Sequence, residues 1–186
     1  SGYDLRLITQ AIVLSRSYQF EAISSSRPQE AAEVFACQSI RGLTGEQLYD
    51  SLRIAGGLPN DRDDLDPHNG LRRRNEFAAD FYTASPVDAQ RSISQALTLM
   101  NGELVKRVTD PNIGPTIVAV AESPFLDNPG RIEALYLAAL SRKPNPQELS
   151  RSLSHLGQRR DSQDLAQVIS NLFWALLNSS EFNCNH

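Results

Sequence analysis

Hydrophobic positions along most of the chain recur every three or four residues, which is the spacing of one face of an α-helix. Leu5, Ile8 and Ile12 show this spacing near the start. The last third of the chain shows it most clearly, in the ranges 128–143, 145–157 and 161–177. No alternating pattern of five or more residues indicates a strand. The pattern predicts an all-α protein, an irregular bundle of about six helices in a single helical domain that spans residues 1–186.

Capping signals predict where several of these helices begin and end. Thr44 and Gln47 have the spacing of a capping box, in which each side chain bonds the backbone N–H of the other residue. Gly56-Gly57 follows the same helix and predicts its end, because glycine readily adopts a positive φ. Two further helix starts are predicted at Asn128-Pro129 and Asn145-Pro146, where a polar cap precedes a proline.

The predicted helices over residues 128–143 and 161–177 also carry signals at their C-terminal ends. Arg142 and Lys143 are expected to complement the negative end of the helix over residues 128–143. Residues 178–181 read Asn-Ser-Ser-Glu, which is typical of a helix stop with local bonds from side chain to backbone. Phe173 and Trp174 lie within an apolar helix and are predicted to belong to the core.

Residues 57–90 break the helical pattern and are predicted to form one long polar loop, with a short extended piece around residues 77–82. Its acidic residues, Asp61, Asp63, Asp64 and Asp66, are hard oxygen donors of the kind that calcium prefers. Leu65 occupies the fifth position of the loop and no glutamate closes a twelve-residue loop, so the EF-hand pattern fails. A solvated acidic loop is preferred over a metal site.

The same loop contains Arg72, Arg73 and Arg74 in succession, with His68 just upstream. Guanidinium groups match phosphate, sulfate and carboxylate oxygens, so these residues are candidates for binding an anion such as an anionic sugar. The preferred alternative is local pairing with the acidic residues upstream, which stabilises little when exposed.

Composition narrows the classes of partner. The chain has 186 residues and a formal net charge of −4. This acidic balance gives no overall attraction to nucleic acid, so no nucleic-acid partner is expected. No apolar run approaches the roughly 20 residues of a membrane-spanning helix. The length is sufficient to bury a core without a metal or a disulfide.

Motifs that carry chemistry are scarce. The sequence has no Gly-x-Ser-x-Gly, no His-x-x-x-His and no phosphate-binding glycine loop, so no catalytic residue is assigned and a non-catalytic role is favoured. It has no Cys-x-x-Cys-His, so no covalently held haem is expected in this segment, and no other motif indicates a cofactor there. Cys37 and Cys184 are its two cysteines. A bridge between them is one alternative, and two unpaired thiols are the preferred one.

Two runs near the C-terminus stand out as motifs. One is IEALYLAALSRKP at residues 132–144, followed by Pro146-x-Glu148, and the other is LFWALLNSSEF at residues 172–182, followed by Asn185-His186. These runs resemble the C-terminal end of DUF family 1553, a domain of large planctomycete proteins. Residues 1–5, 15–19, 41–48 and 95–102 resemble the middle section of that family. Residues 57–90 do not follow its pattern.

The resemblance implies a cellular context and no mechanism. Members of the family usually carry an upstream domain, DUF family 1549, and often a cytochrome-c-like domain with an export signal. The chain would then be the middle and C-terminal part of an exported protein of the periplasm or cell envelope, with haem in an upstream domain. The family supplies no catalytic role for any matching residue.

Three functional hypotheses follow. The favoured one is a non-catalytic structural or interaction module, whose partners are other domains of the same parent chain. The alternative is part of an enzyme or binding module for an anionic, sulfated polysaccharide, with a site built from the arginines, His68 and the acidic residues of the loop. A third is a carbohydrate-binding module that exposes flat aromatic side chains, of which Phe81 and Tyr82 are the best candidates.

Overall fold

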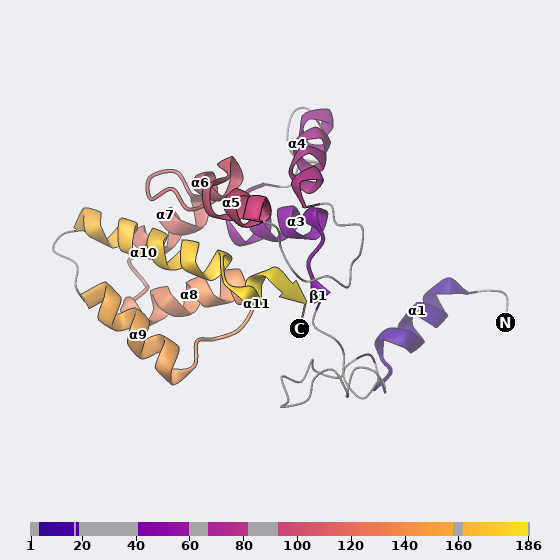
Figure 1. The fold of residues 1–186 in the computed structure, drawn as a ribbon. Coiled ribbons are helices and arrows are strands. Elements are labelled where there is room, and N and C mark those ends of the chain that lie inside the picture. The colour runs from indigo at the N-terminus through magenta and orange to yellow at the C-terminus, as the bar shows by residue number, and fades with distance from the viewer. Residues whose placement is uncertain are drawn as a thin grey trace. The chain divides into compact units, whose positions relative to one another are not determined.

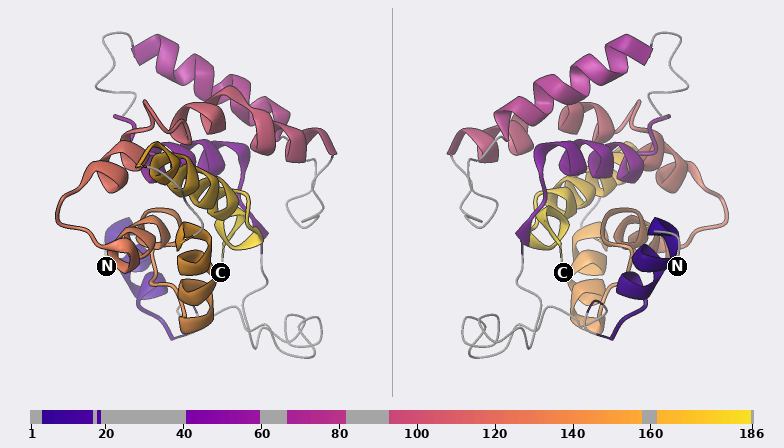
Figure 2. Two further views of the ribbon diagram at one scale, coloured as in Figure 1. Left: turned by 90° about the vertical axis from the view of Figure 1, so that its left-hand side faces the viewer. Right: turned by 90° about the vertical axis from the view of Figure 1, so that its right-hand side faces the viewer.

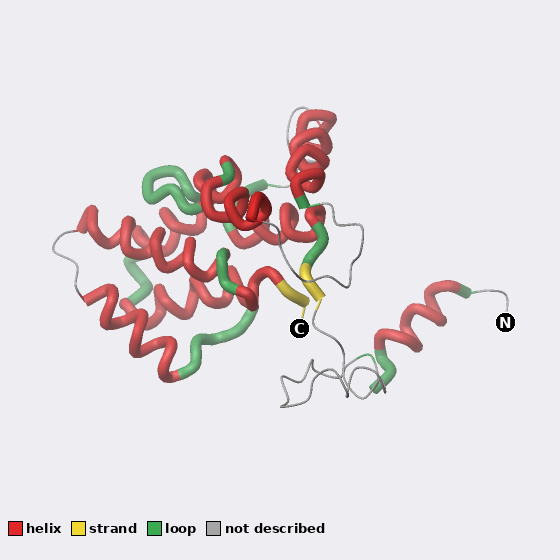
Figure 3. The backbone as a smooth tube through the Cα atoms, viewed as in Figure 1, coloured by secondary structure: helices red, strands yellow, loops and turns green. Residues whose placement is uncertain are grey.

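In a computed structural model of the chain, the described residues are 4–16, 18, 41–59, 67–81, 93–157 and 162–185. Contacts within the chain divide it into two units, Ser1–Arg41 with Cys184–His186 and Gly42–Asn183. The all-α prediction is confirmed. Figure 3 shows that helices make up most of the described backbone. The prediction of a single domain stays a prediction.

The smaller unit contains helix α1 (Leu5–Val13). Asp4 caps it, because its carboxylate accepts hydrogen bonds from the backbone N–H groups of Arg6 and Leu7. Two short strands, β1 (Arg41–Gly42) and β2 (Cys184–Asn185), pair with each other.

The larger unit is a bundle of helices, labelled in Figure 1. Their bounds are α3 (Gly45–Ala55), α4 (Pro67–Asp80), α5 (Ile93–Asn101), α6 (Glu103–Val108), α7 (Pro115–Glu122), α8 (Asn128–Leu140), α9 (Pro146–Gly157), α10 (Ser162–Leu177) and α11 (Ser180–Asn183). The described residues thus contain more helical segments than the six or so that the sequence predicts. The extra segments are short or lie in the predicted loop.

Helix α10 lies at the centre of one half of the core. It contacts α7, α8, α9 and α11, and α8, α9 and α10 lie side by side in Figure 1. Ile169 and Phe173 on α10 are completely buried, and Trp174 packs against the same core while its indole N–H donates to the carbonyl of Met100. Burial of this wide apolar face is the main force that holds the helices together.

Helix α3 forms the other half of the core. Leu48 and Leu52 are fully buried, and α3 contacts α4, α6 and α8. The predicted capping box is present, because Thr44 Oγ1 accepts from Gln47 N and Gln47 Oε1 accepts from Thr44 N. Gly57 has a φ of 69°, so the predicted glycine stop is also confirmed. Figure 2 shows α4 extending along one side of this half.

The predicted loop over residues 57–90 is wrong for its central part, because residues 67–80 form helix α4. Its buried side carries Gly70, Arg74, Phe77 and Phe81, which are three or four residues apart. Because that face includes a glycine and an arginine, the sequence shows no continuous apolar stripe that would indicate a helix here. The extended piece predicted around residues 77–82 is also wrong, since Phe77 lies within the helix.

The start of α8 differs from the prediction by one residue. Asp127 is the N-cap and accepts a hydrogen bond from Gly130 N, and Asn128 is the first helical residue. Helix α8 ends at Leu140, and Ser141 follows with a positive φ of 55°. The chain therefore turns sharply before Arg142.

Helix α3 packs closely against the end of α4 at Gly45. A Cβ atom there would lie 2.7 Å from Ala78 Cα and 2.9 Å from Phe81 Cβ. We expect Gly45→Ala to lower the free energy of unfolding by about 1–3 kcal/mol, because α4 must move away. Chemical denaturation measures this loss. Gly157→Ala is the control, since a Cβ there meets nothing within 4 Å, and an equal loss in both variants would contradict the close approach.

Candidate functional site

The three successive arginines on α4 do not converge on one site. Consecutive helical residues are rotated by about 100°, so their side chains leave the helix in different directions. Arg74 donates from Nη2 to Asp50 Oδ2 at 2.8 Å and from Nε to Oδ1 at 3.0 Å, which ties α4 to α3. Arg72 pairs with Glu76 at 3.7 Å, and both side chains are exposed. Arg73 lines a cavity.

The other predicted site residues are only partly described. Asp61, Asp63, Asp64, Asp66 and Cys37 lie outside the described residues, and His68 is described only as a backbone position in the first turn of α4. Cys184 is half-buried. In the described part of the chain, no group of three or more His, Cys, Asp or Glu residues is placed to hold a metal ion.

A cavity of about 530 Å³ lies among α3, α4 and α6. This volume falls within the range of roughly 300–1,000 Å³ that is usual for small-molecule sites. Its lining comes from three separate stretches of the chain. The lining residues are Tyr49, Arg53, Leu58, Pro59, Arg73, Glu76, Phe77, Asp80, Glu103, Leu104 and Arg107.

Aromatic rings form one wall of this cavity. The rings of Tyr49 and Phe77 lie 5.6 Å apart, and Phe77 stacks on Phe81 at 4.8 Å. Arg53 is held in the same wall, because its guanidinium lies 5.7 Å from the Tyr49 ring centroid and donates to the carbonyl of Pro59. Phe81 is only 8% exposed, so the prediction that it presents an exposed platform for carbohydrate is wrong. Tyr82 lies outside the described residues.

The cavity also brings together both signs of charge. Arg53, Arg73 and Arg107 contribute guanidinium groups, and Glu76, Asp80 and Glu103 contribute carboxylates. Guanidinium groups donate to oxyanions and carboxylates accept from hydroxyl groups, so the lining can bond a ligand that carries both. Sequence reasoning identified only Arg73 among these residues. The others are charged residues on predicted helices or loops, and a spacing such as the four residues from Glu103 to Arg107 is equally typical of a solvated helix face.

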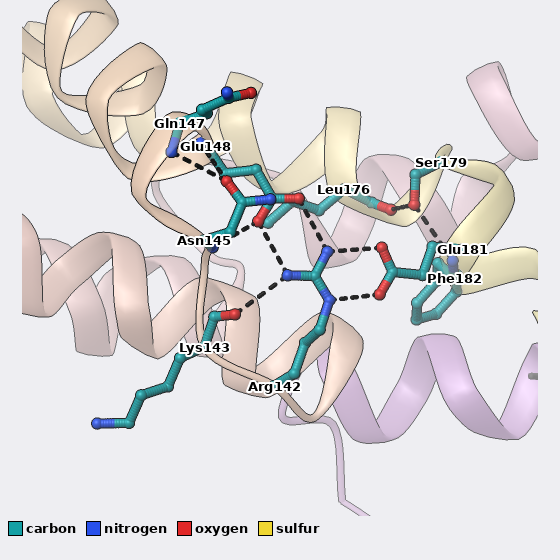
Figure 4. Close-up of polar contacts among 9 residues, drawn as sticks. All are labelled: Arg142, Lys143, Asn145, Gln147, Glu148, Leu176, Ser179, Glu181 and Phe182. Atoms are coloured by element: carbon teal, nitrogen blue, oxygen red, sulfur yellow. Dashed lines mark hydrogen bonds and ion pairs between the residues drawn. The ribbon is translucent and has the colours of Figure 1, made fainter. Parts of the chain in front are cut away.

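A second polar cluster lies where the C-terminal helices meet. Figure 4 shows the Arg142 guanidinium between the carboxylates of Glu148 and Glu181. Its Nη1 and Nη2 lie 2.9 Å from the two oxygens of Glu148, and Nη2 lies 2.7 Å from Glu181 Oε2. Nη1 also donates to the carbonyl of Lys143. One side chain therefore joins the end of α8 to the first turn of α9 and to α11.

Glu148 has a second role in this cluster. Its carboxylate accepts from Asn145 N at 2.7 Å, while Asn145 Oδ1 accepts from the backbone N–H groups of Gln147 and Glu148. The start predicted at Asn145-Pro146 is thus a complete capping box. The bonds from Arg142 lower the pKa of Glu148 to about 2. The hydrogen bond to Glu181 is the largest cause that raises the pKa of Arg142 above its ordinary value, and the hydrogen bond to Glu148 is the next largest.

The prediction that Arg142 and Lys143 complement the negative end of α8 is wrong. The last turn of α8 holds no basic residue, because the helix ends at Leu140. Arg142 lies beyond the turn at Ser141 and faces the two glutamates, with its guanidinium carbon 5.6 Å from the centroid of the buried Tyr136 ring. Lys143 instead pairs with Glu133 at 2.6 Å on the surface.

The predicted stop after α10 is confirmed. Asn178 Nδ2 donates to the carbonyl of Trp174, and Ser179 Oγ donates to the carbonyl of Leu176. Ser179 Oγ also accepts from Phe182 N, which starts the short helix α11 that carries Glu181. The local bonds of Ser179 therefore position Glu181 for Arg142.

No protein family, curated protein or solved structure matches the chain. The resemblance to DUF family 1553 therefore stays a prediction. Among the described residues, no helix has both the length and the apolar character needed to cross a membrane.

Removing the Arg142 side chain leaves two carboxylates close together without their cation. We expect Arg142→Ala to lower the free energy of unfolding by about 2 kcal/mol, because bonds to charged groups are lost at a half-buried site. Lys143→Ala, the adjacent control, should cost less than about 1 kcal/mol, because its ion pair is exposed. Denaturant titration of both variants measures the difference. Equal losses would contradict the structural role of Arg142.

The depressed pKa of Glu148 makes stability depend on pH. A carboxyl whose pKa is lower in the folded state stabilises the fold above its unfolded pKa, and this contribution is lost as pH falls through the folded pKa. The free energy of unfolding should therefore fall as pH is lowered from about 4.5 to about 2. In Glu148→Gln, which keeps an oxygen to cap α9, this fall should be smaller. If the unmodified chain and Glu148→Gln lose stability identically as the pH falls, the pH dependence does not come from the Glu148 carboxyl.

Proposed function

We propose that the chain is a non-catalytic helical module that holds other domains of a longer, exported chain in position. These domains are those that the sequence resemblance implies, including a haem-bearing domain of the cytochrome-c type. The proposed site of action is the periplasm or the cell envelope.

One observation carries this proposal. The polar residues that make the motifs recognisable bond to one another or to the backbone. Arg142 bonds Glu148 and Glu181, and Asn178 and Ser179 bond the backbone of α10. The Thr44 and Gln47 pair caps α3 in the same way. A residue whose polar atoms are held in such bonds supports the fold and is poorly placed to act as a reagent.

The alternative, an enzyme that acts on an anionic polysaccharide through Arg72, Arg73, Arg74 and His68, requires these side chains to converge. Arg74 is held by Asp50 on α3, and Arg72 pairs with Glu76 on its own helix. Arg73 lies in the cavity instead. The arrangement of the arginines favours the non-catalytic module.

The surface around α7 supports an interaction role. Phe125, just after α7, is 93% exposed, and Ile113, just before it, is 65% exposed. Aromatic side chains are enriched at the energetic centres of protein interfaces. We propose that Phe125 contacts another domain of the parent chain.

The experiment measures binding between this chain and the remaining domains of the parent, expressed separately, by isothermal titration calorimetry. The proposal predicts saturable binding without turnover, weakened at least about tenfold by Phe125→Ser. The melting temperature should not change, because a side chain this exposed contributes little to the fold. Ile54→Ser, at a side chain that is 75% exposed on α3, is the matched control. Absence of binding would contradict the module function, and unchanged binding by Phe125→Ser would contradict the assigned surface.

A further inference from the structure

We propose that the cavity among α3, α4 and α6 binds an anionic sugar unit, one that carries a carboxylate or a sulfate ester on a hydroxylated ring. This inference goes beyond the module function and does not depend on it. It also differs from a site built on the three successive arginines, because it uses only Arg73 of that set.

The cavity has the size and the fixed walls of a small-molecule site. Its volume of about 530 Å³ suits a small molecule. Its walls belong to helices that are packed against one another, since α3 contacts both α4 and α6. The ion pair between Arg74 and Asp50 and the close approach at Gly45 fix α4 on α3, so the two walls that they carry are held in place.

The charges of the lining define the ligand. Arg73 on α4 and Arg107 on α6 both line the cavity, so it offers guanidinium groups from two helices to an oxyanion. Glu76, Asp80 and Glu103 offer only acceptors when ionised, which suit the hydroxyl groups of a sugar and repel a ligand that carries anions all around. A simple inorganic anion would contact the arginines and make no bond to the carboxylates of the lining.

The aromatic wall completes the match. Tyr49 and Phe77 supply apolar surface beside the charged groups, and Phe77 is held by its stacking on Phe81. Arg53 is fixed over the Tyr49 ring, which keeps that wall in one position. Sugar rings present apolar C–H faces as well as hydroxyl groups, so a lining that sets aromatic surface beside charged groups suits them.

The test is a nuclear magnetic resonance titration of the ¹⁵N-labelled chain at constant ionic strength. The probes are D-galacturonate, D-galactose 6-sulfate, uncharged D-galactose and sodium sulfate. We expect saturable shifts of backbone amides in the lining, such as those of Tyr49 and Leu104, with one or both anionic sugars. Saturation by only one of them identifies the oxyanion as carboxylate or sulfate ester. Galactose and sodium sulfate should bind at least about tenfold more weakly, because galactose lacks the oxyanion and sulfate lacks the hydroxylated ring.

Substitutions then locate the site. Arg73→Gln and Arg107→Gln should each weaken binding of the anionic sugar by about tenfold or more, as expected for loss of a charged hydrogen bond. Lys106→Gln removes the same charge from α6 outside the lining and should change affinity by less than about twofold. The amide spectrum of each variant shows whether it is folded. Absence of saturable shifts, equal binding of galactose or of sodium sulfate, or unchanged affinity in both arginine variants would overturn the proposal.

Discussion

The bonds of the Arg142 guanidinium fix how the C-terminal helices of the larger unit are arranged around their apolar core. Arg142 reaches Glu148, six residues ahead, and Glu181, which is 39 residues ahead. A half-buried cation between two carboxylates is favourable only while all three groups are present, because the glutamates alone would repel each other. The bonds therefore specify a mutual arrangement of α8, α9 and α11, which the apolar core alone would fix less tightly.

Local features of this fold could be predicted from the sequence with good accuracy. The capping box at Thr44 and Gln47, the cap at Asn145 and Glu148 and the stop at Gly57 depend on residues within four positions of one another, and all three are present. The sequence does not predict helix α4, because the buried face of this helix includes Gly70 and Arg74, and burial of that arginine needs Asp50 on another helix. A pattern that counts only apolar residues does not contain this information.

The cavity could not be predicted from the sequence either, because it also depends on contacts between segments that lie far apart in the chain. Its lining comes from α3, α4 and α6, and which faces of these helices meet depends on packing between distant segments. Sequence alone grouped Arg73 with its neighbours Arg72 and Arg74, whereas the helix separates them. Arg107 on α6 shares the cavity with Arg73 although the two residues lie far apart in the sequence. Proximity along the chain was therefore a poor guide to proximity in the site.

The central claim is that the recognisable polar residues of this chain stabilise the fold. A double-mutant cycle between Arg142 and Glu181, with Arg142→Ala, Glu181→Ala and the double variant compared by denaturant unfolding, tests it most directly. The account predicts that the double variant is more stable than the sum of the two single losses implies, by at least about 1 kcal/mol. Losses that simply add would show that the two side chains do not support each other, and would contradict the account.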